Sequence, residues 1–279
     1  MREIRISVST IEQATAAARQ GAMPVFSLRD LALSAVTGVQ PEQLPGDIPF
    51  GVLLNVPIAQ TQLEKTCAIT QKVLDAGADI LYFSDPAILS FCNEQQRKVL
   101  VYRPETLLTS PQDAAFWMEQ GIGGISVSPL LTKSETTRIL STTEHAEVTI
   151  HGHLLLSVSR RKLLSAWKDY YQIDLDPLYH TGLAIRETTR QEDMPVYETD
   201  YGTMMFSDFV LESFEELSGF KQAEAGFIDG SFLDSETLLE TLNLYQQLLN
   251  GESCIEAIND YRMRHPECSK GYYDQKTIL

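Results

Sequence analysis

Short runs of apolar and β-branched residues recur along this chain, and most are followed by a segment with a helical pattern. The first seven runs begin roughly 20–30 residues apart, which is the repeat of a strand followed by a helix. Eight strands separated mostly by helices can form either a closed barrel or an open doubly wound sheet. The expected strands are Ile4–Val8, Met23–Leu28, Phe50–Val56, Asp79–Ser84, Lys98–Arg103, Gly123–Val127, Glu147–His151 and Ala223–Asp229.

The segments between these runs carry helix start and stop signals. Thr10 is a candidate N-cap, and Pro111 stands at the first position of another expected helix. No G-x-G-x-x-G motif follows the first strand, so an open dinucleotide-binding sheet lacks its main signature. The sequence therefore predicts an α/β fold, a (β/α)8 TIM-like barrel that is either complete or distorted. The expected helices are Thr10–Gln20, Thr61–Ala76, Ser110–Gln120 and Ser134–Ser141.

The regular spacing breaks after His151, because about 70 residues separate the seventh and eighth strands. In a barrel, an insertion after a strand lies at the C-terminal face, where active sites are found. We expect a barrel over residues 1–250 that includes an insertion at 157–220. A polar C-terminal segment, 251–279, is expected to pack on this barrel.

The composition is that of an ordinary globular protein with a strongly acidic balance. It is 43% hydrophobic, and its formal net charge is −16. Such a surface repels phosphate backbones, so nucleic-acid binding is expected only through a partner or a local basic patch. We expect no transmembrane span and no signal peptide, which makes the cytoplasm the default compartment.

The four cysteines are scattered and include no C-x-x-C pair, which argues against a disulfide framework and excludes a zinc ribbon. His151-Gly152-His153 could present two rings to one face of a strand, but no third ligand stands nearby in the sequence. A hydrogen-bonded histidine at a strand end is the simpler interpretation. We therefore expect no metal site.

Polar residues stand at the ends of many expected strands, and in a barrel they would meet at one rim. His151, His153 and Asp229 among them, together with Glu147 at the start of the seventh expected strand, are candidates for acid–base catalysis, although strand ends are often polar without any function. No G-x-S-x-G or Cys–His signature of a nucleophilic hydrolase is present. The full set is Ser9, Arg29, Asn55, Asp85, Arg103, Glu105, Ser128, His151, His153 and Asp229.

One concentrated basic cluster stands out in the acidic chain. Ser157, Ser159, Arg160, Arg161 and Lys162 combine hydroxyls and cations that could hold a phosphate or a carboxylate. The alternative is a helix start with solvated basic side chains. Arg103, at the end of the fifth expected strand, is a further candidate for substrate binding.

The stretch EVTIHGHLLLSVSRRKLLSAW resembles the signature segment of peptidase family U32, with matches at Glu147, Val148, His151, Gly152, Ser159, Leu164 and Ser165. The blocks AGADILYFSDPAIL, TSPQDAAFWMEQGIGGISVSPLLTKSE, MPVYETDYGTMMF, AGFIDGSF and GYYDQKTIL are similar to other family blocks in the same order. The ordered set extends the resemblance over nearly the whole chain.

The chain departs from this family at the signature cysteines. Leu155 and Arg161 stand where the resemblance places two of them, and no counterpart of the later pair lies between Trp167 and Tyr201. In similar proteins these cysteines hold an iron–sulfur cluster, which needs thiolates. The resemblance therefore implies a family member that carries no cofactor.

In its short length and its SRRKLL motif, the chain resembles the smaller member of a protein pair linked to hydroxylation of the tRNA wobble uridine. This resemblance implies a longer, cluster-bearing U32 protein as partner, with tRNA contacted only through that partner. A homodimer is another arrangement to consider. Two alternatives stay open: a collagenase-like peptidase, as the family label says, and a barrel enzyme or binding protein for a small organic anion held near Arg103, His151 and Arg161.

Overall fold

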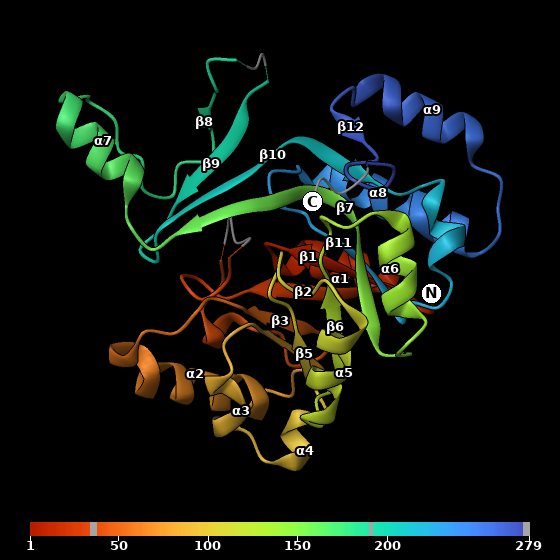
Figure 1. Cartoon of the computed structure of the whole chain (residues 1–279), viewed down its shortest axis with the longest axis horizontal. Coiled ribbons are helices and arrows are strands. Elements are labelled where there is room, and N and C mark those ends of the chain that lie inside the picture. Colours follow the sequence, from red (N-terminus) through yellow and green to blue (C-terminus); the bar gives the residue numbers. More distant parts are fainter. Residues whose placement is uncertain (34–37, 190–191, 276–279) are drawn as a thin grey trace.

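Eight parallel strands close into a barrel in the computed structural model, which describes residues 1–33, 38–189 and 192–275 (Figure 1). The last strand of the barrel, β11, pairs with both β1 and β7, and this double pairing closes the barrel. The predicted (β/α)8 fold and all eight expected strands are confirmed. The strands are β1 (Glu3–Val8), β2 (Met23–Ser27), β3 (Gly51–Leu54), β4 (Ile80–Phe83), β5 (Leu100–Tyr102), β6 (Gly124–Val127), β7 (Ala146–Ser159) and β11 (Ala225–Ile228).

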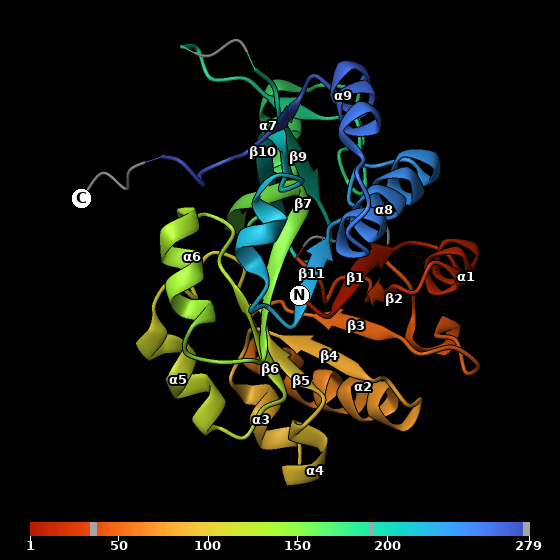
Figure 2. The same ribbon diagram turned by 90° about the vertical axis from the view of Figure 1, so that its right-hand side faces the viewer.

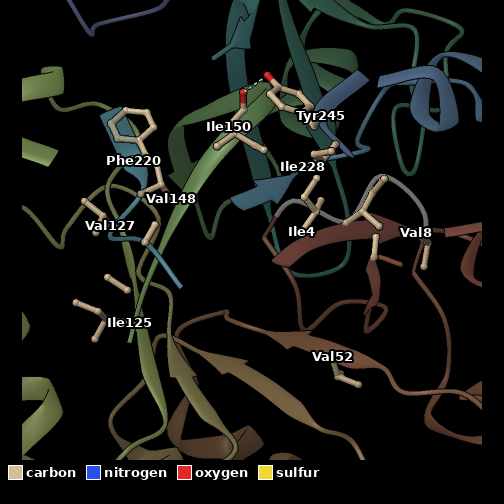
Figure 3. Packing of buried hydrophobic residues seen from close by; sticks show 14 of the residues in the cluster. Ile4, Val8, Val52, Ile125, Val127, Val148, Ile150, Phe220, Ile228 and Tyr245 are labelled. Carbon is tan, nitrogen blue, oxygen red and sulfur yellow. Dashed lines mark hydrogen bonds between the residues drawn. The ribbon is translucent and has the colours of Figure 1, made fainter. Parts of the chain in front are cut away.

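Alternation along the strands divides the core into two layers. On β1, Ile4, Ile6 and Val8 belong to the large apolar cluster between barrel and helices, part of which is drawn in Figure 3. The barrel interior holds a smaller apolar cluster and a polar layer. That inner cluster includes Val25, Leu53, Ile80, Tyr82, Val101 and Phe227.

Helices cover the barrel, and their ends follow the capping signals in the sequence. The side chains of Thr10 and Ser110 accept hydrogen bonds from backbone N–H groups of the helices that they start. The four expected helices correspond to α1, α2, α5 and α6, within two residues at each end. Helices of the barrel are α1 (Ile11–Arg19), α2 (Leu63–Asp75), α3 (Ala87–Phe91), α4 (Glu94–Arg97), α5 (Pro111–Glu119) and α6 (Lys133–Leu140), with 3-10 turns η1 (Pro41–Gln43), η2 (Gln60–Gln62) and η3 (Glu216–Phe220).

The sequence predicts that the seventh strand ends at His151, but in the structure β7 continues to Ser159. Its outer half pairs with β10 (Thr203–Glu212), which supplies backbone partners from residues distant in sequence. Along the chain, one helix and two further strands separate β7 from β10: α7 (Leu163–Tyr171), β8 (Ala184–Ile185) and β9 (Met194–Glu198). We call residues 154–189 and 192–206 the arm; Figure 1 shows α7 at its far end, away from the barrel helices.

The C-terminal part of the chain packs beside β7 and α1. Helices α8 (Ser235–Leu249) and α9 (Ile255–Arg264) lie on this side of the barrel, as Figure 2 shows. The short strand β12 (Cys268–Ser269) then pairs with β10, and Tyr273 donates to the carbonyl of Thr149 on β7. The last residues of the expected C-terminal segment, 276–279, lie outside the described residues. No helix among the described residues is long and apolar enough to cross a bilayer.

Candidate functional site

Glu147 is the centre of a buried polar network inside the barrel. Its side chain is 1% exposed. Its Oε1 accepts a hydrogen bond from Arg103 (2.9 Å), and its Oε2 accepts from Arg5 (3.2 Å) and Tyr82 (2.6 Å). Arg5, Tyr82 and Glu147 belong to β1, β4 and β7, and Arg103 follows directly after β5. Because both oxygens are occupied by cations and a phenol, Glu147 acts as a structural anion that holds these strands together.

Arg103 is enclosed by the same network. Its Nε donates to Glu105 Oε1 (3.1 Å), and its guanidinium lies over the ring of Phe227 at 4.0 Å. Burial opposes the positive charge, but Glu105 and Glu147 outweigh this effect and raise the pKa of Arg103. A guanidinium neutralised by two carboxylates is a poor site for a substrate anion.

Glu105 is placed differently, because it lines a cleft of about 260 Å³ at the C-terminal mouth of the barrel. Its Oε1 accepts from Asn55 Nδ2 (2.6 Å) as well as from Arg103. Burial raises the pKa of the Glu105 carboxyl, and the Arg103 charge offsets this only in part. A buried carboxyl with a raised pKa beside a cleft can exchange a proton with a bound molecule.

The backbone of Glu105 also departs from ordinary geometry, with φ at +58°. A non-glycine residue in this left-handed region carries strain, which concentrates at functional sites. The arm also lines this cleft, through Leu155 and Ser157. Ser157, a predicted binding residue, therefore shares this cleft with Glu105.

His151 lies on the other side of the barrel wall. Strand β7 pairs with β11 through Thr149 and then His151, so the register shifts at Ile150. As a result the imidazole points outward: its nitrogens contact the hydroxyls of Tyr245 (3.4 Å) and Tyr261 (3.2 Å). Burial lowers the pKa of His151 to about 3, so the ring is neutral at physiological pH.

His153 and Asp229 lie nearer to the mouth of the barrel. His153 Nδ1 contacts the carbonyl oxygen of Ser207 (2.8 Å), and burial lowers the pKa of the ring. Asp229 accepts hydrogen bonds from the backbone N–H of Ser231 (2.9 Å) and the hydroxyl of Ser7 (3.4 Å). The contacts described here for the two histidine rings are with tyrosines and a carbonyl, not with a serine or cysteine nucleophile.

The basic cluster of the sequence lies in the arm. Lys162 pairs with Asp200 (2.6 Å), and the guanidinium of Arg160 lies 5.5 Å from the centre of the Tyr201 ring. Arg161 is exposed, and its backbone N–H donates to the hydroxyl of Ser159 (3.2 Å). Arg103, His151 and Arg161 therefore do not converge: they lie in the barrel interior, in its outer layer and on the arm.

Several residues of these networks were missed by sequence reasoning. Arg5 and Tyr82 share Glu147, and the alternation Ile-Arg-Ile-Ser-Val in β1 is the signal that could have placed Arg5 inside the barrel. Glu105 was recognised only as one of many strand-end residues. Neither its backbone conformation nor its place beneath the arm can be read from the sequence.

The positions of the expected family cysteines do not fit an iron–sulfur cluster. Leu155 is 5% exposed and packs in an apolar cluster with Tyr197, Met204 and Phe206. A leucine side chain offers no metal ligand, and Arg161 would add a positive charge. Among the described residues, no group of three or more His, Cys, Asp or Glu side chains is arranged to hold a metal ion, and the four cysteines are free.

The chain is similar to known proteins in structure and in sequence. A solved structure entitled "The Structure of the U32 Peptidase Mk0906" aligns with a TM-score of 0.48 and 12% sequence identity, over 82% of this chain and 92% of that chain. No curated protein matches the sequence. The sequence profile described as "Peptidase family U32" matches residues 49–277. This match spans most of the barrel and the whole arm, and the chain belongs to peptidase family U32.

Proposed function

We propose that this chain is a cluster-free subunit that works with a longer, cluster-bearing U32 protein in hydroxylation of the tRNA wobble uridine. In this proposal the redox step belongs to the longer subunit, and tRNA is contacted through it. Family membership and the residues of the signature segment support the proposal.

The observation that carries the proposal is the environment of Leu155. A position where the family resemblance expects a thiolate is filled by a buried aliphatic side chain that packs in an apolar cluster. Tyr197, Tyr201 and Phe206 occupy the neighbouring space, so the site is packed by side chains. A chain adapted in this way fits a subunit that supports a cluster-bearing relative better than an independent redox enzyme.

The test is deletion of the gene in a strain that lacks other routes to the modification. Nucleosides from digested tRNA are then measured by mass spectrometry. We expect the hydroxylated wobble uridine to disappear and to return with the wild-type gene. Unchanged levels of the modified nucleoside would refute the proposal.

A second experiment addresses the cofactor assignment. The chain purified alone is expected to be colourless and free of iron, whereas its complex with the longer protein carries the iron of that protein. Iron bound stoichiometrically by the isolated chain would contradict the assignment.

The collagenase-like peptidase alternative is tested by incubating the pure protein with gelatin and with short peptides. Cleavage that the variant His153→Ala abolishes would favour the peptidase. We expect none, because the contacts described for the two histidine rings activate no nucleophile.

A further inference from the structure

Helix α7 is almost uncovered by the rest of the chain. None of its residues is buried, and Leu163, Trp167 and Tyr170 are 49%, 46% and 80% exposed. A nine-residue helix is marginal in water on its own. It is fixed at its start by Glu198, whose carboxylate accepts from the backbone N–H groups of Leu164 (2.8 Å) and Ser165 (3.0 Å). The helix is thus held in place while its apolar side chains remain in solvent.

An apolar groove lies along this helix. Its volume is about 400 Å³, and its lining includes Leu163 and Trp167 of α7 together with Leu175, Ile185 and Val196 of later segments of the arm. Of the twelve large apolar side chains that are exposed among the described residues, seven lie between Val158 and Ile185. Such a concentration is unusual for the surface of a monomer and is typical of an interaction site.

A run of basic residues leads into the groove. Residues 157–168 contain four basic and no acidic side chains, in a chain with a net charge of −16. Within the part of the chain that the structure describes, no carboxylate pairs with Arg161 or Lys168. Asp200 pairs with Lys162, so Arg161 before α7 and Lys168 within it are the cations next to the groove that lack a carboxylate partner among the described residues.

We propose that this groove binds an apolar segment flanked by acidic residues on the longer U32 protein. The inference rests on the proposed function and adds the surface through which the two chains associate. The apolar lining provides the contact area, and the unpaired cations select acidic neighbours and increase the association rate.

The chemistry of the groove favours this occupant over two others. Its lining is mainly aliphatic, whereas single-stranded RNA is bound on aromatic platforms within a basic channel. A second copy of this chain would present the same basic segment in a two-fold contact, which would bring like charges together.

The two tryptophans provide a direct probe. Trp167 lines the groove, and Trp117 is buried beside Phe83 and Tyr102. The chain labelled with 5-fluorotryptophan should give two ¹⁹F resonances, assigned with Trp117→Phe and Trp167→Phe. Addition of the purified longer U32 protein from the same organism is expected to shift the Trp167 signal and leave the Trp117 signal in place.

Affinity for the longer protein is then measured for variants of the groove. Leu163→Glu and Trp167→Glu should each weaken binding by about tenfold or more, because each places a charge in an apolar contact. The double variant Arg161→Glu/Lys168→Glu should weaken it several-fold and reduce its salt dependence. Met263→Glu, at an exposed apolar residue of α9, is the matched control and should bind as the wild type does.

The outcomes separate the two proposals. Binding that persists unchanged in Leu163→Glu and Trp167→Glu overturns the docking surface while the partner function stands. No binding by the wild-type chain, with tRNA modification unaffected by gene deletion, overturns both. A wild-type dimer in light scattering that Leu163→Glu dissociates identifies a second copy as the occupant, and a Trp167 shift with tRNA alone identifies RNA; either result refutes the inference.

Discussion

The barrel and the arm treat charged and apolar side chains in opposite ways. In the barrel, the buried cations Arg5 and Arg103 both pair with the buried Glu147. Apolar side chains fill the remaining space. In the arm, Arg161 is exposed, and so is the apolar face of α7. The barrel therefore pairs its buried charges internally, whereas the arm leaves apolar side chains and a cation in solvent, which is where we propose the contact with the partner.

The largest expected effect concerns the barrel network. Glu147→Ala leaves the buried cations Arg5 and Arg103 without their shared anion, so we expect a loss of about 3–5 kcal/mol in the free energy of unfolding. Urea denaturation measures this. The control Glu144→Ala removes an exposed partner of Arg2 and should change stability by less than about 0.5 kcal/mol. A small effect of Glu147→Ala would show that the barrel does not depend on paired buried charges.

The second prediction concerns Gly152, where β7 leaves the barrel. Its φ is +122°, and an added Cβ would lie 2.5 Å from the carbonyl oxygen of Asp229. Gly152→Ala should cost about 3 kcal/mol, the sum of left-handed strain and overpacking. Gly121→Ala has a positive φ but open space around it, and should cost only about 1 kcal/mol. Equal losses in thermal unfolding would mean that the approach of Asp229 to Gly152 is not tight.

The third prediction concerns the pH dependence of stability. His151 has a pKa of about 3 in the folded protein against 6.5 in the unfolded chain, so the unfolded state binds more protons below pH 6.5. Stability is therefore unaffected by this group above pH 6.5 and falls as the pH decreases toward 3. Between pH 7.5 and 5 the loss should be about 2 kcal/mol.

His153 contributes in the same direction, because its pKa is also lowered. The contribution of His151 is isolated by His151→Gln, which cannot titrate. Urea denaturation at several pH values should give a flatter profile for this variant than for the wild type. If the stability of the two proteins changed with pH in parallel, the pKa of His151 would not be lowered by burial, and the ring would be in contact with water rather than behind α8 and α9.

The smallest effect is expected in the arm. Glu198→Gln removes the carboxylate that accepts from the start of α7, and should lower the free energy of opening this helix by about 1–2 kcal/mol. Hydrogen exchange with mass spectrometry should show faster exchange in residues 163–171 and unchanged exchange in the barrel strands. Asp200→Asn, which weakens the exposed contacts of Asp200 with Lys162 and Tyr179, is the control and should have little effect. Equal acceleration of exchange in α7 and in the barrel strands would show that arm and barrel unfold as one cooperative unit, and would contradict the prediction.

The sequence alone determined the barrel and the family. Spacing of the apolar runs, the caps Thr10 and Ser110 and the ordered motifs are local signals, and local signals fix strands, helices and their order. The resemblance to the family placed two of the expected cysteine positions at Leu155 and Arg161.

Only the tertiary structure decided which side chains meet. The register shift at Ile150 turned His151 outward, and pairing with β10 extended β7 into the arm. Both depend on partners far away in the chain, which no local pattern encodes. For the same reason, neither the cleft between Glu105 and the arm nor the groove that α7 forms with other segments of the arm could be read from the sequence.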